Sequence, residues 1–493
     1  MELRKANDLF KEAREAMEGR REDGTPCVQD HAKAEALLNE LLDNNVGNPL
    51  IVYMLATLHM THRRYGLAVQ LLTYVVKHQP EFGEAWNNLG LSYKDLNNWD
   101  NAAQCAIKAA ELLNHPDVMT NAAACHLGRA TPEIALDWCD RALALSPNHL
   151  QARWHKGMAL LEMGRFEEAW DWHESRMEGG GNYSMTPRNY HGAETTPKWD
   201  GRTPGTVVIH GEQGMGDEVM FASCMRDALA TGARIILEPS PRLEGLFRRS
   251  FPGCDLVFGT DDTDGAGWIE ERGAPDFKCA IGTLPSFYRR SLDAFPGTPY
   301  LVADPKRMEA VKARLWALGR RPKVGIAWQG GVPSTRCDAR SFHPRLFGPM
   351  LVEHDVDWIS LQYDWSAAQC AADVRNETGV DIHHWPEYVE ARDPATGKPS
   401  SMDDLAALIA GLDLVITVPQ TCYHIAGALG VPCVVLTQSE PDWRLGVAGD
   451  TVPWYSSVRL IRQAKGTRNW QPVILEASRR IEGLLSPQRA KAM

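Results

Sequence analysis

The sequence predicts a helical repeat array in the first part of the chain and two successive α/β units after it, which is an α plus α/β fold class. Three observations carry this prediction. Alanines recur at steps of 33 or 34 residues as far as Ala169. A β-branched run at 206–209 meets a glycine-rich turn and then a helical pattern, and a second strand running into glycines begins at Lys323. Repeats of this length form helical solenoids, whereas strand, glycine turn and helix form the unit of a parallel sheet.

The repeat signal comes from small residues at fixed spacing. The recurring alanines are Ala34, Ala68, Ala102, Ala135 and Ala169. Gly90 and Gly157 each precede their alanine by twelve residues. This is the tetratricopeptide pattern, in which two antiparallel helices cross closely at small side chains. We predict a solenoid over residues 1–177, with four clear repeats from about residue 48 and a degraded one before them.

The use of such a solenoid is open at the level of sequence, because repeat architecture fixes shape and not ligand. The concave face can recruit a partner protein, including a protein or glycan acceptor. Alternatively, the array packs on the units that follow or joins copies of the chain into a homo-oligomer. The sequence favours neither use.

The repeat period ends at Met177, where a glycine- and polar-rich stretch begins. We predict a linker over 178–205 and a first Rossmann-like half over 206–321. In that half, strands are expected at 206–209, 231–240, 254–259 and 276–288, with helices from 217, over 241–253 and over 305–321.

A second Rossmann-like half is predicted over 322–493. Strands are expected at 323–331, 356–364, the end of 402–418 and 431–439, with helices at the start of 402–418, over 421–432 and over 472–485. Two such halves in tandem form a cleft, because parallel strands present ligand groups at their carboxyl ends.

Composition excludes several classes of protein. The formal charge of −11 argues against a nucleic-acid-binding surface, since phosphate contacts need clustered Lys and Arg. No stretch has the apolar length of a membrane span, and the N-terminus is a charged amphipathic helix rather than a signal peptide. The eleven cysteines form no CxxC pair, so the expected setting is a reducing cytoplasm.

Eight motifs in order then carry a family resemblance. They are PKWDG at 197–201, GEQGMGDEVMFA at 211–222, GIAWQGG at 325–331 with Arg340-Ser341 after it, SLQ at 360–362, DLAALIAGLDLVITV at 404–418, HIAGALGVP at 424–432, DWR at 442–444 and VPWYSSVRLIRQ at 452–463. Together, over about 163–471, they resemble the tetratricopeptide-repeat proteins that carry a GT-B glycosyltransferase domain. Those proteins are related to heptosyltransferases and more distantly to O-GlcNAc and flagellin-glycosylating transferases.

The resemblance implies a GT-B double Rossmann-like pair with glycosyltransferase activity. The reaction would be an inverting, metal-independent transfer from a nucleotide sugar, with no other cofactor. The donor would bind mainly in 322–493, and the acceptor would enter from 206–321 and the repeats.

Asp217 is the candidate general base. The aspartate of the matching Gly-Asp motif in heptosyltransferases takes the proton of the acceptor hydroxyl, and a carboxylate within reach can do so. The alternative is a helix N-cap, a role that Asp often fills. His210 and Glu212 are rival bases. Gln213, Gly214 and Gly216 are expected on the acceptor side of the cleft.

His424 is the main candidate for donor binding, because it lies at the start of a helix that follows a buried strand. N–H groups at a helix N-terminus can take a pyrophosphate, and Thr421 and Gln420 would share that role. The alternative is a structural histidine. The family usually has Asp-Thr after this strand, whereas this chain has Pro419-Gln420, which removes a carboxylate and an N–H.

Arg340 is the candidate cation for the departing diphosphate, since charge develops there in the transition state. Arg336 lies in the same loop, and either arginine can instead be a solvated loop charge. Other expected donor contacts, all in loops that follow strands, are Gln329, Gln362, Asp442 and Trp443. Trp443 can also be a packing residue, as can Trp454.

Three functions follow from these patterns. The first is a glycosyltransferase acting on a protein or glycan acceptor recruited by the repeats. The second is a catalytically impaired relative that serves as a repeat-based scaffold, which the Pro419-Gln420 replacement favours. The third is another enzyme on the same scaffold, such as a nucleotide-sugar epimerase.

Overall fold

The computed structural model describes residues 3–21, 25–44, 47–178, 196–259, 273–331, 337–363, 366–390 and 400–492. The chain divides into two compact units, residues 1–159 and 160–493. The division falls within helix α9 (Leu150–Glu162). Each unit has its own core and is described by itself.

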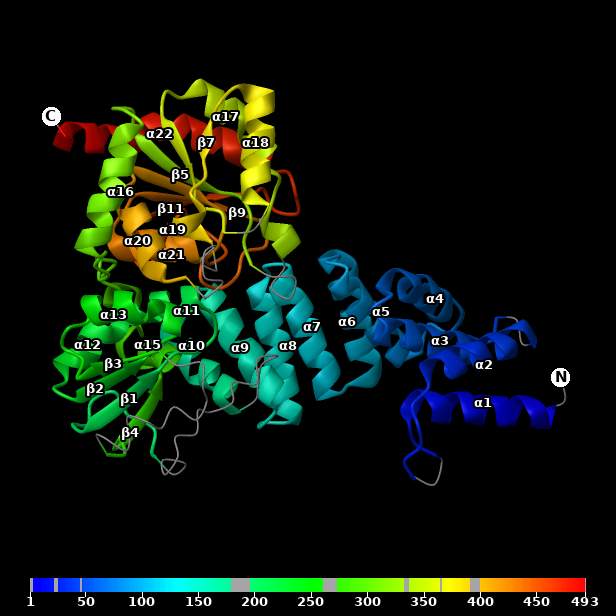
Figure 1. Ribbon diagram of the computed structural model, residues 1–493. Helices are drawn as coiled ribbons and strands as arrows, with labels where there is room; N and C mark the ends of the chain where they lie inside the picture. Colours follow the sequence, from blue (N-terminus) through cyan, green and yellow to red (C-terminus); the bar gives the residue numbers. More distant parts are fainter. Residues whose placement is uncertain are drawn as a thin grey trace. The chain divides into compact units, whose positions relative to one another are not determined.

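The first unit is built of antiparallel helix pairs (Figure 1). Its helices are α1 (Leu3–Glu18), α2 (His31–Asn44), α3 (Pro49–Thr61), α4 (Tyr65–His78), α5 (Gly83–Asp95), α6 (Trp99–Leu113), α7 (Pro116–Gly128), α8 (Pro132–Leu145) and the first part of α9. The recurring alanines at positions 34, 68, 102 and 135 are all fully buried. A Cβ added at Gly90 on α5 would lie 3.2 Å from the backbone oxygen of Ala102 on α6. Small residues therefore allow the close crossing that the spacing predicted, and the helical repeat array is confirmed.

Local signals explain where these helices begin and end. Asn48 accepts a hydrogen bond from the Leu50 amide (3.0 Å) and caps α3, and Asn98 accepts one from Asn101 (3.3 Å) and caps α6. Asn97 and Asn114 have φ values of 56° and 45°, a left-handed conformation that asparagine tolerates at helix ends.

The second unit opens with α10 (Phe166–His173) and the 3₁₀ helix η1 (Glu174–Glu178) and then forms a four-stranded parallel sheet. Its strands are β1 (Thr206–His210), β2 (Arg234–Glu238), β3 (Leu256–Val257) and β4 (Phe277–Ala280), in the order β3-β2-β1-β4. The intervening helices are α11 (Met215–Phe221), η2 (Ala222–Cys224), α12 (Met225–Ala230), η3 (Pro241–Leu243), α13 (Glu244–Ser250), η4 (Ile281–Thr283), α15 (Leu284–Tyr288), η5 (Leu292–Ala294) and α16 (Pro305–Ala317). The first strand lies in the interior of the sheet, so the glycine turn that follows it is at the centre of the carboxyl edge.

The second sheet of this unit has seven strands in the order β10-β11-β9-β8-β5-β6-β7. They are β5 (Lys323–Ala327), β6 (Asp357–Ser360), β7 (Ile382–His383), β8 (Leu414–Thr417), β9 (Cys433–Thr437), β10 (Thr451–Val452) and β11 (Tyr455–Arg462). The helices are η7 (Cys337–Arg340), η8 (Pro344–Phe347), α17 (Gly348–Glu353), α18 (Ala367–Thr378), α19 (Pro386–Val389), α20 (Met402–Ala410), α21 (Thr421–Leu429) and α22 (Gln471–Ala492). Every strand pairs in parallel except β10, which is antiparallel to β11. In Figure 1 this sheet is drawn in yellow-green to orange and the first one in green.

The central strands of the second sheet are buried on both faces, which explains their continuous apolar sequences. All residues of β5, β6, β8 and β9 are buried. Trp328, Trp358 and Phe347 are among the largest side chains in the core around them. The α plus α/β class is therefore confirmed.

Most of the stretch predicted as a linker, residues 179–195, lies outside the described residues. The part that is described, 196–205, runs along β4, since Trp199 donates its amide to Lys278 O (2.9 Å). Trp199 is buried, and its Nε1 donates to Thr203 O (2.9 Å). This end of the stretch is thus packed onto the sheet.

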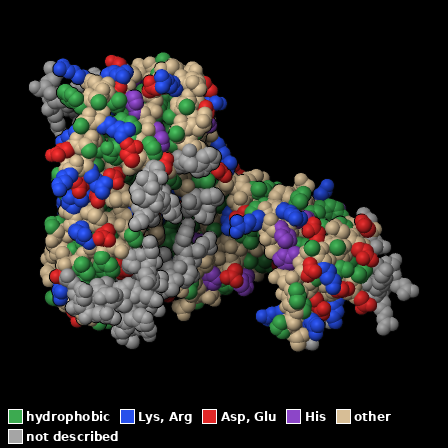
Figure 2. Space-filling model, viewed as in Figure 1, with side chains coloured by type: hydrophobic (Ala, Val, Ile, Leu, Met, Phe, Trp, Pro, Cys, Tyr) green, Lys and Arg blue, Asp and Glu red, His purple; other side chains and the backbone are tan. Residues whose placement is uncertain are grey.

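On the face shown in Figure 2, basic and acidic side chains are interspersed over both units. Within the part of the chain that the structure describes, no helix combines the length and the apolar character needed to cross a membrane.

Candidate functional site

The glycine turn after β1 presents Asp217 from the first turn of α11. Gly214 occupies the N-cap position, and its amide donates to Asp217 Oδ2 (3.3 Å). Asp217 therefore stabilises the helix from the third helical position and not from the N-cap position that the sequence suggested. Its other carboxylate oxygen faces away from this contact.

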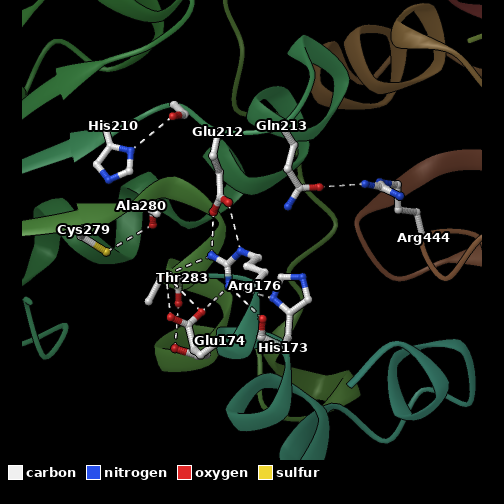
Figure 3. Close-up of polar contacts among 12 residues, drawn as sticks. His173, Glu174, Arg176, His210, Glu212, Gln213, Cys279, Ala280, Thr283 and Arg444 are labelled. Atoms are coloured by element: carbon white, nitrogen blue, oxygen red, sulfur yellow. Dashed lines mark hydrogen bonds and ion pairs between the residues drawn. The ribbon is translucent and has the colours of Figure 1, made fainter. Parts of the chain in front are cut away.

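That second oxygen is paired with an arginine from the other sheet's loops. Arg444 lies between β9 and β10, and its Nε donates to Asp217 Oδ1 at 2.5 Å. Its Nη2 donates to Gln213 Oε1 at 3.1 Å (Figure 3). Burial disfavours the charge on Arg444, but the carboxylates of Asp217 and Asp442 outweigh it and raise the pKa of Arg444. The candidate base is thus held in a partly buried ion pair.

Gly216 brings α11 into direct contact with α21. A Cβ at this position would lie 2.9 Å from Cδ2 of His424 and 3.7 Å from Cα of Thr421. The sequence predicted that Gly216 and Gln213 face an acceptor. In the structure Gly216 packs on His424 and Gln213 bonds to Arg444, because the two halves meet closely at this point.

His424 is a buried, neutral histidine. Its Nδ1 lies 3.0 Å from the hydroxyl of Tyr455. Burial, followed by the charge of Arg444, holds the pKa of His424 well below its ordinary value. The ring can therefore take part in neutral hydrogen bonds at the start of α21, where the helix N-terminus lies.

Glu212, a rival base, is fixed in a buried ion pair. Arg176 from η1 donates Nη2 to Glu212 Oε1 (2.6 Å) and Nε to Oε2 (3.0 Å), a bidentate arrangement (Figure 3). The same guanidinium contacts Glu174 (2.5 Å) and Thr283 (3.1 Å). Burial opposes ionisation of Glu212, yet Arg176 lowers the pKa of this carboxyl. Glu212 therefore anchors the glycine turn. His210, the other rival, is buried at the end of β1.

Glutamines follow five neighbouring parallel strands of the second sheet. They are Gln463 after β11, Gln438 after β9, Gln420 after β8, Gln329 after β5 and Gln362 after β6. Parallel strands end at the same edge of a sheet, so these amides form a row along the carboxyl edge. Three of them keep a buried atom without a hydrogen-bond partner among the described residues, namely Oε1 of Gln420, Oε1 of Gln438 and Nε2 of Gln463.

The amide of Gln362 supports the backbone of the neighbouring loop. Its Oε1 accepts from the amides of Trp328 (3.2 Å) and Gln329 (3.0 Å), and its Nε2 donates to Gln329 O (3.3 Å). Gln362 is fully buried. It therefore orients the loop that carries Gln329, which is half-buried.

The loops after β5 and β8 touch at Gly330. A Cβ at this position would lie 2.3 Å from the backbone oxygen of Pro419. Gln420 is buried, and its Nε2 donates to Thr417 Oγ1 (3.4 Å). The unusual Pro419-Gln420 pair is thus part of a close loop contact that requires glycine opposite it.

Arg340 ends η7 and is half-buried. Its charge acts on Tyr423, the third residue of α21, whose pKa burial raises well above the ordinary value. The role of Arg340 as a donor-side cation stays a prediction. Arg336 lies outside the described residues.

Trp443 is a packing residue in an aromatic cluster. Its ring centroid lies 6.1 Å from that of Trp170, 6.3 Å from Phe221 and 6.5 Å from Trp454. The guanidinium of Arg444 lies 4.8 Å from the centroid of the Trp443 ring. Asp442 accepts from the Arg444 amide (3.0 Å). Asp442 and Trp443 therefore hold Arg444 in position within this loop.

A cavity of ≈ 250 Å³ borders the same aromatic cluster at Trp454. Arg289 and Ser223 also line it, and no predicted site residue does. Among the described residues, no group of three or more His, Cys, Asp and Glu side chains is arranged to hold a metal ion.

Several residues of this region were not predicted from the sequence. Gln438 and Gln463 follow strand ends, as the predicted glutamines do. Their position after a strand could therefore have identified them from the sequence. Arg444 belongs to the DWR loop that was expected to close over the nucleotide, but its pairing with Asp217, 227 residues away, was not predicted. Arg176 follows the last repeat helix and carried no signal of its own.

Comparison with known proteins finds a repeat family, a relative and several solved structures. The tetratricopeptide repeat family matches residues 53–114. Protein FlbA of Caulobacter vibrioides (strain ATCC 19089 / CIP 103742 / CB 15) is 32% identical over 428 residues, which are 83% of this chain and 68% of FlbA.

Two solved structures resemble part of the chain. MamA is 17% identical with a TM-score of 0.29, covering 30% of this chain and 88% of MamA. YrrB, described as a TPR protein with an unusual peptide-binding site, is 16% identical with a TM-score of 0.29, covering 31% of this chain and 80% of YrrB.

Proposed function

This chain belongs to the family of proteins that includes Protein FlbA of Caulobacter vibrioides, and we propose that its second unit is a GT-B glycosyltransferase. The enzyme moves a sugar from a nucleotide sugar to a protein or glycan acceptor that the repeats recruit in the cytoplasm. Residues 206–321 form the acceptor side, and residues 322–493 form the donor side. The transfer is inverting and needs no metal.

The row of glutamines at the carboxyl edge of the second sheet carries this proposal. Buried polar atoms in folded proteins nearly always have partners, so three unpartnered amide atoms at one sheet edge favour a ligand site. Amides offer both donors and acceptors, which suits the base, ribose and phosphates of a nucleotide. The same edge is where open α/β sheets bind nucleotides.

The start of α21 supports the position of the diphosphate. Gln420 and Thr421 bring the N-terminus of a nine-residue helix to this edge, and Arg340 is proposed to add a positive charge there. His424 lies in the first turn of the same helix. The donor thus lies along Gln329, Gln420, Thr421 and Arg340.

The proximity of Asp217 supports its role as the base. The turn at Gly216 lies against Thr421 and His424, so the Asp217 carboxylate is next to the proposed diphosphate position. In the reaction the acceptor oxygen bonds to the anomeric carbon and its proton passes to Asp217. The bond from that carbon to the diphosphate breaks, and the electron pair leaves with the phosphate oxygen.

Replacement of the base tests the proposal. Asp217→Asn keeps the shape of the side chain and removes the proton acceptor, so we expect transfer to fall by about 10²-fold or more. Binding of nucleoside diphosphate should not weaken. Calorimetry with UDP, GDP, ADP and CDP measures binding, and mass spectrometry of the acceptor measures transfer.

The controls separate the base from the fold. Arg345→Gln changes an exposed arginine that pairs with Glu377 (2.8 Å) in the second half and should alter neither quantity. Turnover retained in Asp217→Asn would move the base to another residue. Absence of binding of all four diphosphates to the unchanged protein would overturn the enzyme assignment.

A catalytically impaired scaffold is the second candidate function. Two observations favour it: Pro419-Gln420 replaces the family's Asp-Thr pair, and Asp217 is occupied by Arg444. In that case the repeats would bind a partner protein, and the second unit would bind no nucleotide. The same calorimetry distinguishes the two candidates.

A further inference from the structure

We propose that Arg444 alternates between Asp217 and the donor's diphosphate, so that donor binding is what frees the base. This inference rests on the proposed glycosyl transfer. It makes Arg444 a catalytic residue that binds the leaving group, and it sets an order in which the donor binds before the acceptor reacts.

The contacts of Asp217 show which groups compete with an acceptor hydroxyl for its carboxylate. Its Oδ1 accepts from Arg444 Nε at 2.5 Å, and its Oδ2 accepts from the Gly214 amide at 3.3 Å. Each oxygen therefore already accepts one hydrogen bond. An acceptor hydroxyl has to compete with these donors for the carboxylate, and a side chain moves aside more readily than the backbone of a helix cap.

Arg444 is also placed to reach the start of α21. Asp217, its partner, follows Gly216, where an added Cβ would lie 2.9 Å from Cδ2 of His424 and 3.7 Å from Cα of Thr421. Both residues stand in the first turn of the helix that is proposed to hold the diphosphate. The ion pair of Asp217 and Arg444 therefore lies beside the proposed diphosphate position.

The charges favour this exchange when the donor is present. A guanidinium has five N–H donors in a planar fork that matches phosphate oxygens, and a diphosphate carries more negative charge than one carboxylate. The guanidinium of Arg444 lies over the ring of Trp443, and we expect the loop to keep its fold during the exchange. After the exchange Arg444 stabilises the charge that develops on the leaving diphosphate, and Asp217 is free to accept the acceptor's proton.

Four proteins test the alternation by their affinity for nucleoside diphosphates. We expect Arg444→Gln to weaken binding of UDP, GDP, ADP or CDP, whichever the unchanged protein binds, by about tenfold. Asp217→Asn should strengthen the same binding by about fivefold, because it removes the competing anion. The double variant should bind like Arg444→Gln alone. Arg345→Gln serves as the control for loss of a positive charge and should bind like the unchanged protein.

The alternation requires that the two single variants change the affinity for nucleoside diphosphate in opposite directions. If Asp217→Asn binds no more tightly than the unchanged protein while Arg444→Gln binds more weakly, Arg444 is a simple phosphate ligand and the alternation is wrong. If both variants bind like the unchanged protein, Arg444 is a structural residue and the inference fails, although the proposed transfer can stand. If the unchanged protein binds no diphosphate, both fail.

Circular dichroism checks that each variant is folded. If Arg444→Gln does not fold, Arg444→Lys replaces it, because lysine keeps the charge and loses the planar fork. Weaker binding of Arg444→Lys, together with tighter binding of Asp217→Asn, would support the alternation.

Discussion

At the residue scale, Asp217 makes two contacts, and the sequence anticipated only that it lies at the start of a helix. It stabilises the first turn of α11 through the Gly214 amide, and it pairs with Arg444. The glycine turn and the helix start were readable because they follow one another in the chain. The partner was not readable, since local patterns contain no information on a residue 227 positions away.

Gly216 provides a test at the same scale. Gly216→Ala would place a Cβ 2.9 Å from Cδ2 of His424, whose ring is held by Tyr455. We expect the free energy of unfolding of the second unit to fall by about 1–3 kcal/mol. Helix propensity alone favours alanine over glycine by about 1 kcal/mol. A lower free energy of unfolding would therefore have to come from the contact with His424. Urea unfolding followed by tryptophan fluorescence measures it.

Gly214→Ala is the matched control in the same turn. Its added Cβ would lie 3.5 Å from Asp217 Oδ2, which is an ordinary contact. We expect a loss below about 1 kcal/mol, from the poorer N-cap. Equal losses in the two variants would mean that the contact with His424 is not the reason for glycine at position 216.

At the element scale, the helices of the first unit hold two histidines in their neutral form, the buried His126 and the half-buried His155. His126 on α7 has its pKa lowered to about 4 by burial and by Arg129. His155 on α9 has its pKa lowered to about 4 by burial and by Lys94. Neither histidine gains a proton in the folded unit until the pH is well below the ordinary value of 6.5.

This predicts a loss of stability in acid. As pH falls below 6.5, the unfolded chain takes up protons on these histidines that the folded unit does not, so folding becomes less favourable until about pH 4. Urea midpoints measured at pH 7, 6, 5 and 4 should therefore decline. In a His126→Gln, His155→Gln double variant the decline should be shallower. An unchanged slope would mean that other groups cause the acid sensitivity.

The ends of the strands show how far element patterns reach. One rule, a glutamine within three residues of a strand end, covers five strands of the second sheet. Three of these glutamines, Gln329, Gln362 and Gln420, were predicted from the sequence as site residues. The other two, Gln438 and Gln463, also follow strand ends. Whether an amide meets a ligand or the backbone, as Gln362 does, depends on side-chain packing that spacing does not encode.

At the scale of the whole molecule, the repeat period predicted the helix pairs but not the division into units. Ala169 keeps the period, yet α10 belongs to the second unit. Trp170 on α10 donates to Arg289 O (2.9 Å), and Asp171 pairs with Arg290 (3.0 Å). The repeat period depends on how neighbouring helices cross, and it contains no information on which compact unit a helix packs into.

The two units should respond separately to a change in one core. Ala102→Leu adds volume at a fully buried crossing of α5 and α6, and overpacking costs about 1–3 kcal/mol. We expect calorimetry to show one thermal transition lowered by about 5 °C. Binding of nucleoside diphosphate should stay unchanged at room temperature.

Leu67→Ala, at a half-exposed position on α4, is the control and should shift neither transition appreciably. A parallel loss of diphosphate binding in Ala102→Leu would contradict the independence of the two cores. Such a loss would mean that the repeats help to shape the nucleotide site.

The buried pair of Arg176 and Glu212 limits how this sequence can evolve. Loss of Arg176 leaves the Glu212 carboxylate without a cation in the interior, at a cost of about 3–5 kcal/mol, whereas loss of Glu212 leaves Arg176 paired only with the partly exposed Glu174. Replacement of both by apolar residues of similar volume can be nearly neutral. Descendants of this chain should therefore change positions 176 and 212 together or keep both. The ion pair that holds the glycine turn should thus be conserved or lost as a whole.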